Sequence, residues 1–181
     1  MRRMLATAVA LGPLAFACGA QAETVISTER TTPVLTSTAA SGAPDSVRVA
    51  LGGTIRLTSG TAVTLNSSHA VSNEGQILLN DVSTDGTTGI LVQGGNTASV
   101  TNSGVITITD NLTPTDTDSD GDPDGPFATG SGRFGIRVVG PGAFTGDITN
   151  TPAGNIRVEG NQSAAISVET GVVGSSCRIA S

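Results

Sequence analysis

The chain has 181 residues, with 9 basic and 15 acidic side chains and a formal net charge of −6. It contains no Trp or Tyr and 4 Phe. An acidic chain so poor in aromatic residues lacks both the basic surface and the stacking platforms of nucleic-acid-binding proteins, so we expect no nucleic-acid partner.

The first 22 residues have the pattern of a cleavable export signal. Two arginines precede an apolar stretch at 4–16, which is shorter than the roughly 20 apolar residues that span a bilayer. The sequence Ala20-Gln21-Ala22 then supplies small residues at a signal-peptidase site. We expect 1–22 to be a signal peptide cleaved after Ala22, with lipidation of Cys18 as the alternative. No second apolar run follows, so we expect no transmembrane helix.

The rest of the chain has the pattern of many short strands. Stretches of alternating apolar and polar residues are separated by Gly, Asn and Asp, which is typical of strands and turns. In chain order they include Val47-Arg48-Val49, Thr54-Ile55-Arg56-Leu57, Ala62-Val63-Thr64-Leu65, Gln76-Ile77-Leu78-Leu79 and Val105-Ile106-Thr107-Ile108. We expect an all-β fold with an N-terminal extension or cap at 23–44, strands over 45–175 and an irregular tail at 176–181.

Two patterns recur along this region. The first joins a short strand to an Asn and then a Gly, at Asn73 and Gly75, Asn102 and Gly104, and Asn150 and Gly154. The second is a short apolar strand, at Gly89-Ile90-Leu91-Val92, Gly135-Ile136-Arg137-Val138 and Ala165-Ile166-Ser167-Val168. Asn73 to Asn102 spans 29 residues, whereas Asn102 to Asn150 spans 48. An acidic insertion of about 17 residues within 112–132 accounts for the longer interval, so the period is close to 30 residues, a length typical of solenoid repeats.

A period near 30 favours a β-solenoid with about three strands in each coil. Successive coils would stack at the strand spacing of ~4.8 Å, and equivalent Ile and Val side chains would form columns inside. The recurring Asn suits a turn, because it tolerates left-handed backbone and its amide can pair with the amide one coil away. The recurring Gly lets the backbone reverse without a side-chain clash. An immunoglobulin-like sandwich, which requires no fixed period, is the alternative fold.

The signal peptide, the Asn-x-Gly turns and the Gly-Ile-x-Val strands together resemble the passenger region of bacterial autotransporters, over most of 45–175. The resemblance implies a right-handed parallel β-helix that is displayed at the outer membrane by a downstream translocator barrel. It also implies surface display or adhesion to an unknown surface or cell ligand. The strand pattern ends before 176–181, so we expect the N-terminal portion of a longer protein. Its location would be the cell surface, the outer membrane or the extracellular space, or the periplasm without a barrel.

The insertion carries the densest group of possible ligands. Aspartates alternate at Asp116, Asp118, Asp120, Asp122 and Asp124. Oxygen ligands on every second residue, with Gly121 to allow a bend, resemble the first half of a calcium loop. Phe127 stands where such a loop has its bidentate Glu, so a solvated acidic loop is the alternative. If the loop holds an ion, calcium is the one that this pattern suits, and no cofactor is required.

Catalytic patterns are sparse. The chain has one histidine, His69, and no Gly-x-Ser-x-Gly motif. Cys177 is the one cysteine after the signal peptide, so His and Cys metal clusters are excluded by count. A polysaccharide-degrading β-helix enzyme would need carboxylates at matching places in successive coils, and Asp147 and Glu159 do not recur in this way. We therefore expect a non-catalytic protein, with this enzyme class or an immunoglobulin-like binding module as alternatives.

Overall fold

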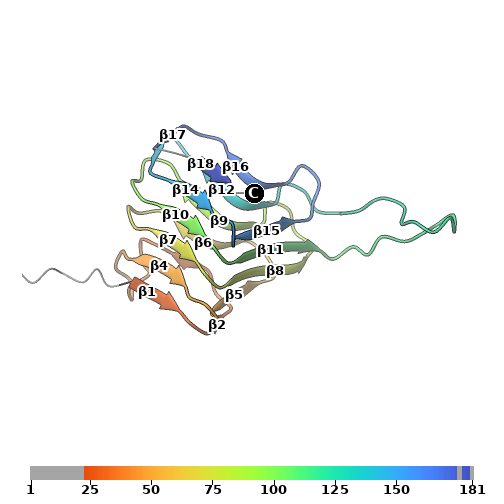
Figure 1. Ribbon diagram of the computed structural model, residues 1–181, viewed down its shortest axis with the longest axis horizontal. Helices are drawn as coiled ribbons and strands as arrows, with labels where there is room; N and C mark the ends of the chain where they lie inside the picture. The colour runs from red at the N-terminus through yellow and green to blue at the C-terminus, as the bar shows by residue number, and fades with distance from the viewer. Residues whose placement is uncertain (1–22, 175–176, 180–181) are drawn as a thin grey trace, which may run out of the picture.

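The computed structural model describes residues 23–174 and 177–179 (Figure 1). The expected signal peptide at 1–22, including Cys18, lies outside the described residues. All secondary-structure elements in the described part are strands, which confirms the prediction of an all-β fold. Within these residues, no helix is long and apolar enough to cross a membrane.

The strands fall into three large sheets and one small one. Sheet A contains β1 (Glu23–Ile26), β4 (Ser46–Val49), β7 (Val71–Asn73), β10 (Val100–Asn102), β14 (Ile148–Asn150) and β18 (Cys177–Ile179). Sheet B contains β2 (Glu29–Arg30), β5 (Thr54–Leu57), β8 (Gln76–Val82), β11 (Val105–Asp110) and β15 (Asn155–Val158). Sheet C contains β3 (Val34–Leu35), β6 (Thr61–Leu65), β9 (Thr88–Gln93), β12 (Phe134–Val139) and β16 (Ala164–Val168). The small sheet pairs β13 (Phe144–Thr145) with β17 (Val172–Val173).

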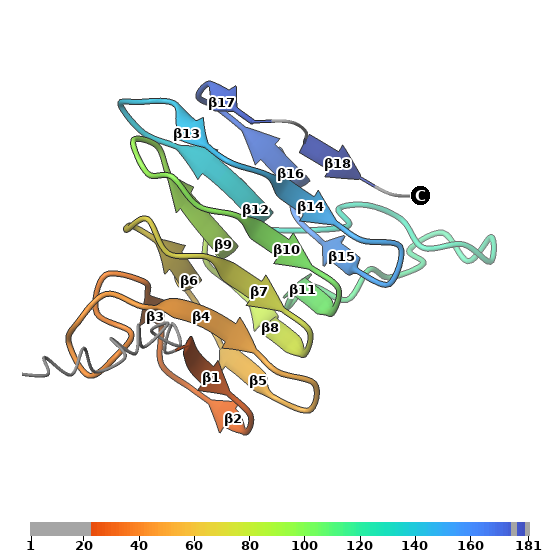
Figure 2. The ribbon, with the colours of Figure 1, turned by 60° about the vertical axis from the view of Figure 1, so that its left-hand side comes forward.

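Neighbouring strands in all four sheets run parallel. Because an immunoglobulin-like sandwich is built from antiparallel sheets, the parallel pairing shows that this alternative is wrong. The chain visits sheets A, B and C in rotation, and we call each such set of three strands a repeat. The five repeats are β1–β3, β4–β6, β7–β9, β10–β12 and β14–β16, stacked one on another (Figure 2).

Repeat length is less uniform than the sequence suggested. Ile77 pairs with Ile106 at an interval of 29 residues, close to the expected period. Ile55 pairs with Ile77 at an interval of only 22. The difference arises partly because β5 has four residues where β8 has seven.

Both ends of the described part of the chain contain strands that the sequence pattern did not indicate. The segment 23–44, expected as an extension or cap, contains the three strands of the first repeat. The expected irregular tail contains β18, which pairs with β14 in the register Cys177 to Ile148. Parallel pairing uses backbone groups that nearly every residue possesses, so a strand can continue after the side-chain pattern has changed.

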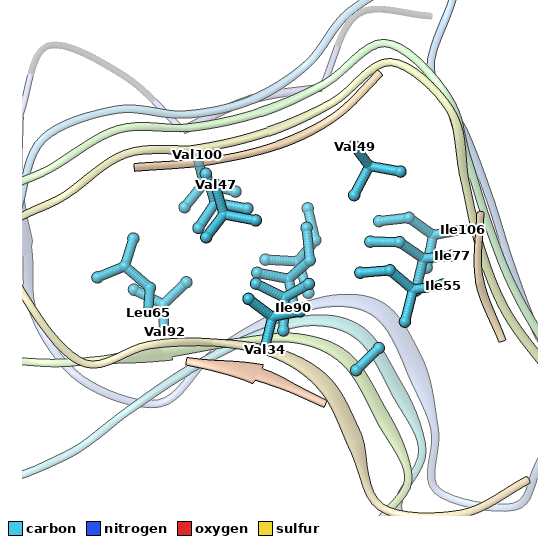
Figure 3. Packing of buried hydrophobic residues seen from close by; sticks show 14 of the residues in the cluster. Val34, Val47, Val49, Ile55, Leu65, Ile77, Ile90, Val92, Val100 and Ile106 are labelled. Carbon is cyan, nitrogen blue, oxygen red and sulfur yellow. The ribbon is translucent and has the colours of Figure 1, made fainter. Parts of the chain in front are cut away.

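The core consists of apolar columns that run along the stack. Alternate side chains of each strand point inward. Ile55, Ile77 and Ile106 stack from sheet B, and all three are fully buried (Figure 3). Val47 and Val100 enter from sheet A in the same way (Figure 3). The interior is therefore filled mainly by aliphatic side chains, with Phe144 as a buried aromatic residue, consistent with the low aromatic content.

Candidate functional site

The longest loop of the described chain leaves the stack between sheets B and C. The connection from β11 to β12 covers residues 111–133, whereas the equivalent connections in the third and fifth repeats cover 83–87 and 159–163. It has 23 residues where its neighbours have 5, and it projects far from the stacked sheets (Figure 1). The insertion expected at 112–132 lies within this loop, which we call the insert.

A buried ion pair joins the two ends of the insert. Arg133 Nη1 donates to Asp110 Oδ2 at 2.8 Å, and the two side chains are 0% and 1% exposed. The guanidinium also donates to Val82 O at 2.6 Å, Thr84 O at 3.2 Å and Glu159 O at 3.1 Å. These carbonyls belong to the chain before and after the insert, so one arginine ties its base to the repeats on both sides.

The Asp110 carboxylate is held by several donors besides the arginine. It accepts hydrogen bonds from Leu112 N at 2.8 Å, Gly130 N at 2.9 Å and Thr129 Oγ1 at 3.0 Å. Burial alone raises the pKa of Asp110, but these hydrogen bonds and the charge of Arg133 outweigh it and lower the pKa from 3.8 to about 2. The carboxylate is therefore ionised at neutral pH. The sequence pattern did not indicate this pair, although an Asp and an Arg flanking the insertion were a usable signal.

The acidic part of the insert gathers three of its five aspartates. The carboxylates of Asp116, Asp118 and Asp120 are exposed and offer ligand oxygens within 4.8 Å of one another. Asp124 lies outside this group and accepts a hydrogen bond from Thr117 N at 2.8 Å. Its bond from the Thr117 hydroxyl is the main reason why the pKa of Asp124 is lowered.

Asp122 also lies outside the group. Calcium takes six to eight oxygen ligands, so three carboxylates would supply part of a coordination sphere.

The three recurring asparagines form a buried amide ladder. Asn73 Nδ2 donates to Asn102 Oδ1, and Asn102 Nδ2 donates to Asn150 Oδ1, both at 2.7 Å. Each asparagine ends a strand of sheet A, and none has the left-handed backbone that a turn position suggested. The ladder ends at Asn73 Oδ1, which is buried without a hydrogen-bond partner, because the next strand has Val49 at this position.

The recurring glycines are required by contact between repeats rather than by chain reversal. A Cβ on Gly75 would lie 2.4 Å from Ala50 O, and one on Gly104 would lie 2.2 Å from Gly75 O. On Gly154 it would lie 2.4 Å from Asn102 O. Successive turns are thus packed backbone against backbone, and any larger residue would push the repeats apart.

The outward-facing carboxylates of Glu169 and Glu23 pair with arginines, and the hydroxyl nearest His69 donates its hydrogen bond to another group. Glu169 binds Arg137 on the outer face of sheet C, with Nε to Oε1 at 2.7 Å, and Arg48 similarly binds Glu23. The Ser67 hydroxyl lies 3.2 Å from His69 Nδ1 but donates at 2.8 Å to another hydroxyl, that of Thr36.

No family model matches the sequence, and comparisons with curated proteins and with solved structures also find no match.

Proposed function

We propose that this protein is an exported, non-catalytic β-solenoid segment that displays the insert for adhesion to a surface or cell ligand. The main supporting observation is that the chain visits three parallel sheets in rotation. Connections between parallel strands of one sheet are almost always right-handed, so we infer a right-handed coil. In such a fold each repeat provides the hydrogen-bonding edge on which the next one stacks.

This architecture suits a protein that holds a loop away from its body. The core lies between the sheets, so a corner loop can lengthen without disturbing the apolar columns. The insert does so at one corner, and the Asp110–Arg133 pair fixes its base. Between residues 111 and 132 it carries five aspartates and no basic residue. It also presents Phe127, which is 65% exposed. A projecting loop with a rigid base is a common way to present recognition groups.

We further propose that the segment belongs to the passenger of a longer autotransporter. The signal-peptide pattern at 1–22 and the repeated strand motifs support this assignment. A downstream barrel would then place the segment at the cell surface or outer membrane. Sequencing the coding region beyond Ser181 in all frames tests the proposal, and absence of further passenger or barrel sequence would contradict it.

Shortening the insert tests the adhesive role. Residues 113–127 are replaced by a short Gly-Ser linker, which keeps Asp110, Thr129, Gly130 and Arg133. Cells that display the shortened and unchanged proteins are then compared for adherence. We expect the shortened protein to be displayed and folded, as judged by antibody binding and circular dichroism, but to adhere poorly. Equal adherence by both proteins would contradict the proposed role of the insert.

A further inference from the structure

The turns between sheets A and B differ in length along the stack. The third and fourth repeats turn through two residues each, 74–75 and 103–104. The second and fifth repeats use four residues, 50–53 and 151–154. These turns lie one above another (Figure 2). Two short turns between two longer ones leave a notch at this corner.

The notch is a defined groove with a volume of about 410 Å³. This volume falls within the range of small-molecule sites. Gly75 and Gly104 are among its lining residues, and we call their backbone the floor of the groove. The backbone of the floor is already paired, since Val105 N donates to Gly75 O and Asn155 N donates to Gly104 O, both at 2.9 Å. Recognition in the groove must therefore come from the side chains around it.

These side chains combine apolar and polar groups. Leu51, which is 87% exposed, and Ala153 come from the long turns, and Val105 comes from the start of β11. Glu74, Gln76 and Ser103 provide polar atoms along the same groove.

The Glu74 carboxylate has capacity for a ligand. Glu74 Oε2 lies 3.4 Å from Arg48 Nη1. Arg48 binds Glu23 more closely, at 2.7 Å. The arginine is thus shared between two carboxylates, and 42% of the Glu74 side chain is exposed. Glu74 can accept hydrogen bonds from hydroxyl groups, whereas an anionic ligand would meet its negative charge.

The geometry points to a short, uncharged saccharide as the ligand of this groove. Sugar hydroxyls would donate to Glu74 and Gln76, and the C–H face of a ring would contact Val105 and Ala153. A peptide strand is disfavoured, because it would need unpaired backbone groups and those of the floor are occupied. This inference goes beyond the proposed adhesive role of the insert, because it assigns a ligand class to a second surface, and its biological meaning rests on the proposed display function.

Ligand-observed saturation-transfer NMR on the purified chain tests the inference. The probes are cellobiose, maltose and N,N′-diacetylchitobiose at millimolar concentration. We expect at least one to receive saturation, and we expect Gln76→Trp, which fills the groove, to abolish the signal. Glu74→Gln should weaken binding about tenfold, since it removes a charged acceptor.

The matched control is Gln93→Trp, which places the same bulk on an exposed glutamine outside the groove. It should leave binding unchanged, and circular dichroism should show that each variant is folded. Binding of none of the three probes, or equal binding by Gln76→Trp, would overturn the inference. Because the adhesion experiment alters only the insert, a failure of saccharide binding is distinguishable from a failure of the display proposal.

Discussion

Asp110 and Arg133 are 23 residues apart in sequence, yet Asp110 Oδ2 and Arg133 Nη1 lie 2.8 Å apart with both side chains buried. The pair closes the base of the insert, and Arg133 also ties this base to the repeats on both sides. A buried pair of this kind is costly to break, because removal of one partner leaves the other charge uncompensated.

Asp110→Asn should therefore lower the free energy of unfolding by about 3–5 kcal/mol. Urea denaturation measures the change. The matched control is Glu169→Gln, which breaks the exposed pair with Arg137 and should cost at most about 1 kcal/mol. The double variant Asp110→Leu with Arg133→Met should be less destabilised than Asp110→Asn. Equal losses of unfolding free energy in Asp110→Asn and Glu169→Gln would contradict a stabilising role of the buried Asp110–Arg133 pair.

Acid should weaken the same contact. The pKa of Asp110 is about 2 in the folded chain and 3.8 ordinarily, so the folded state favours the ionised form. A group with a depressed folded pKa stabilises the protein above its unfolded pKa, and this contribution is lost as pH falls. We expect about 2 kcal/mol to disappear between about pH 4 and pH 2. The difference in unfolding free energy between the wild type and Asp110→Asn should narrow over that range. A constant difference would argue against this contribution of the Asp110 carboxylate.

The amide ladder can be tested at its centre. Asn102→Val removes the acceptor of Asn73 Nδ2 and the donor to Asn150 Oδ1. Leaving buried amide groups unpaired should cost about 1–3 kcal/mol in thermal or urea unfolding. Thr101→Val, on the same strand with its side chain on the outer face, should change stability by no more than about 0.5 kcal/mol. If both variants were equally stable, the ladder would contribute nothing measurable.

Backbone contact between turns makes a separate prediction. Gly104→Ala would place a Cβ 2.2 Å from Gly75 O, so the two repeats must move apart. We expect a loss of about 1–3 kcal/mol, as for other overpacked sites. Gly125→Ala is the control, because its Cβ would meet only the Phe127 ring at 3.5 Å. It should be nearly neutral, and a neutral Gly104→Ala would show that the turns can separate freely.

Calcium binding by the insert remains a prediction from the aspartate pattern. If Asp116, Asp118 and Asp120 contribute ligands, calorimetric titration with millimolar Ca²⁺ should release or absorb heat. Asp118→Asn should reduce that signal, since it removes one charged ligand. Asp81→Asn, an exposed aspartate outside the insert, should not. Absence of any heat at millimolar Ca²⁺ would contradict the prediction and favour a solvated acidic loop.

Much of the fold could be predicted because its determinants are local. Alternation of apolar and polar residues assigns the inward side chains of a strand, as for Ile77 and Leu79 in β8. The repeated Asn and Gly positions indicated which segments are equivalent, and the structure pairs Asn102 with Asn73 on one side and with Asn150 on the other. The first repeat and β18 were missed, because backbone pairing there depends on the neighbouring strand more than on a side-chain pattern.

The residue pattern alone predicted short repeated strands around an aliphatic interior, with an acidic insertion in one repeat, and it favoured a solenoid over a sandwich. Tertiary structure alone decided that Asp110 meets Arg133, that Glu74 shares Arg48 with Glu23, and that short and long turns produce a groove. The physical reason is one of range. Side-chain periodicity acts over a few residues, whereas these contacts depend on register between repeats, which is fixed only when the backbone edges pair.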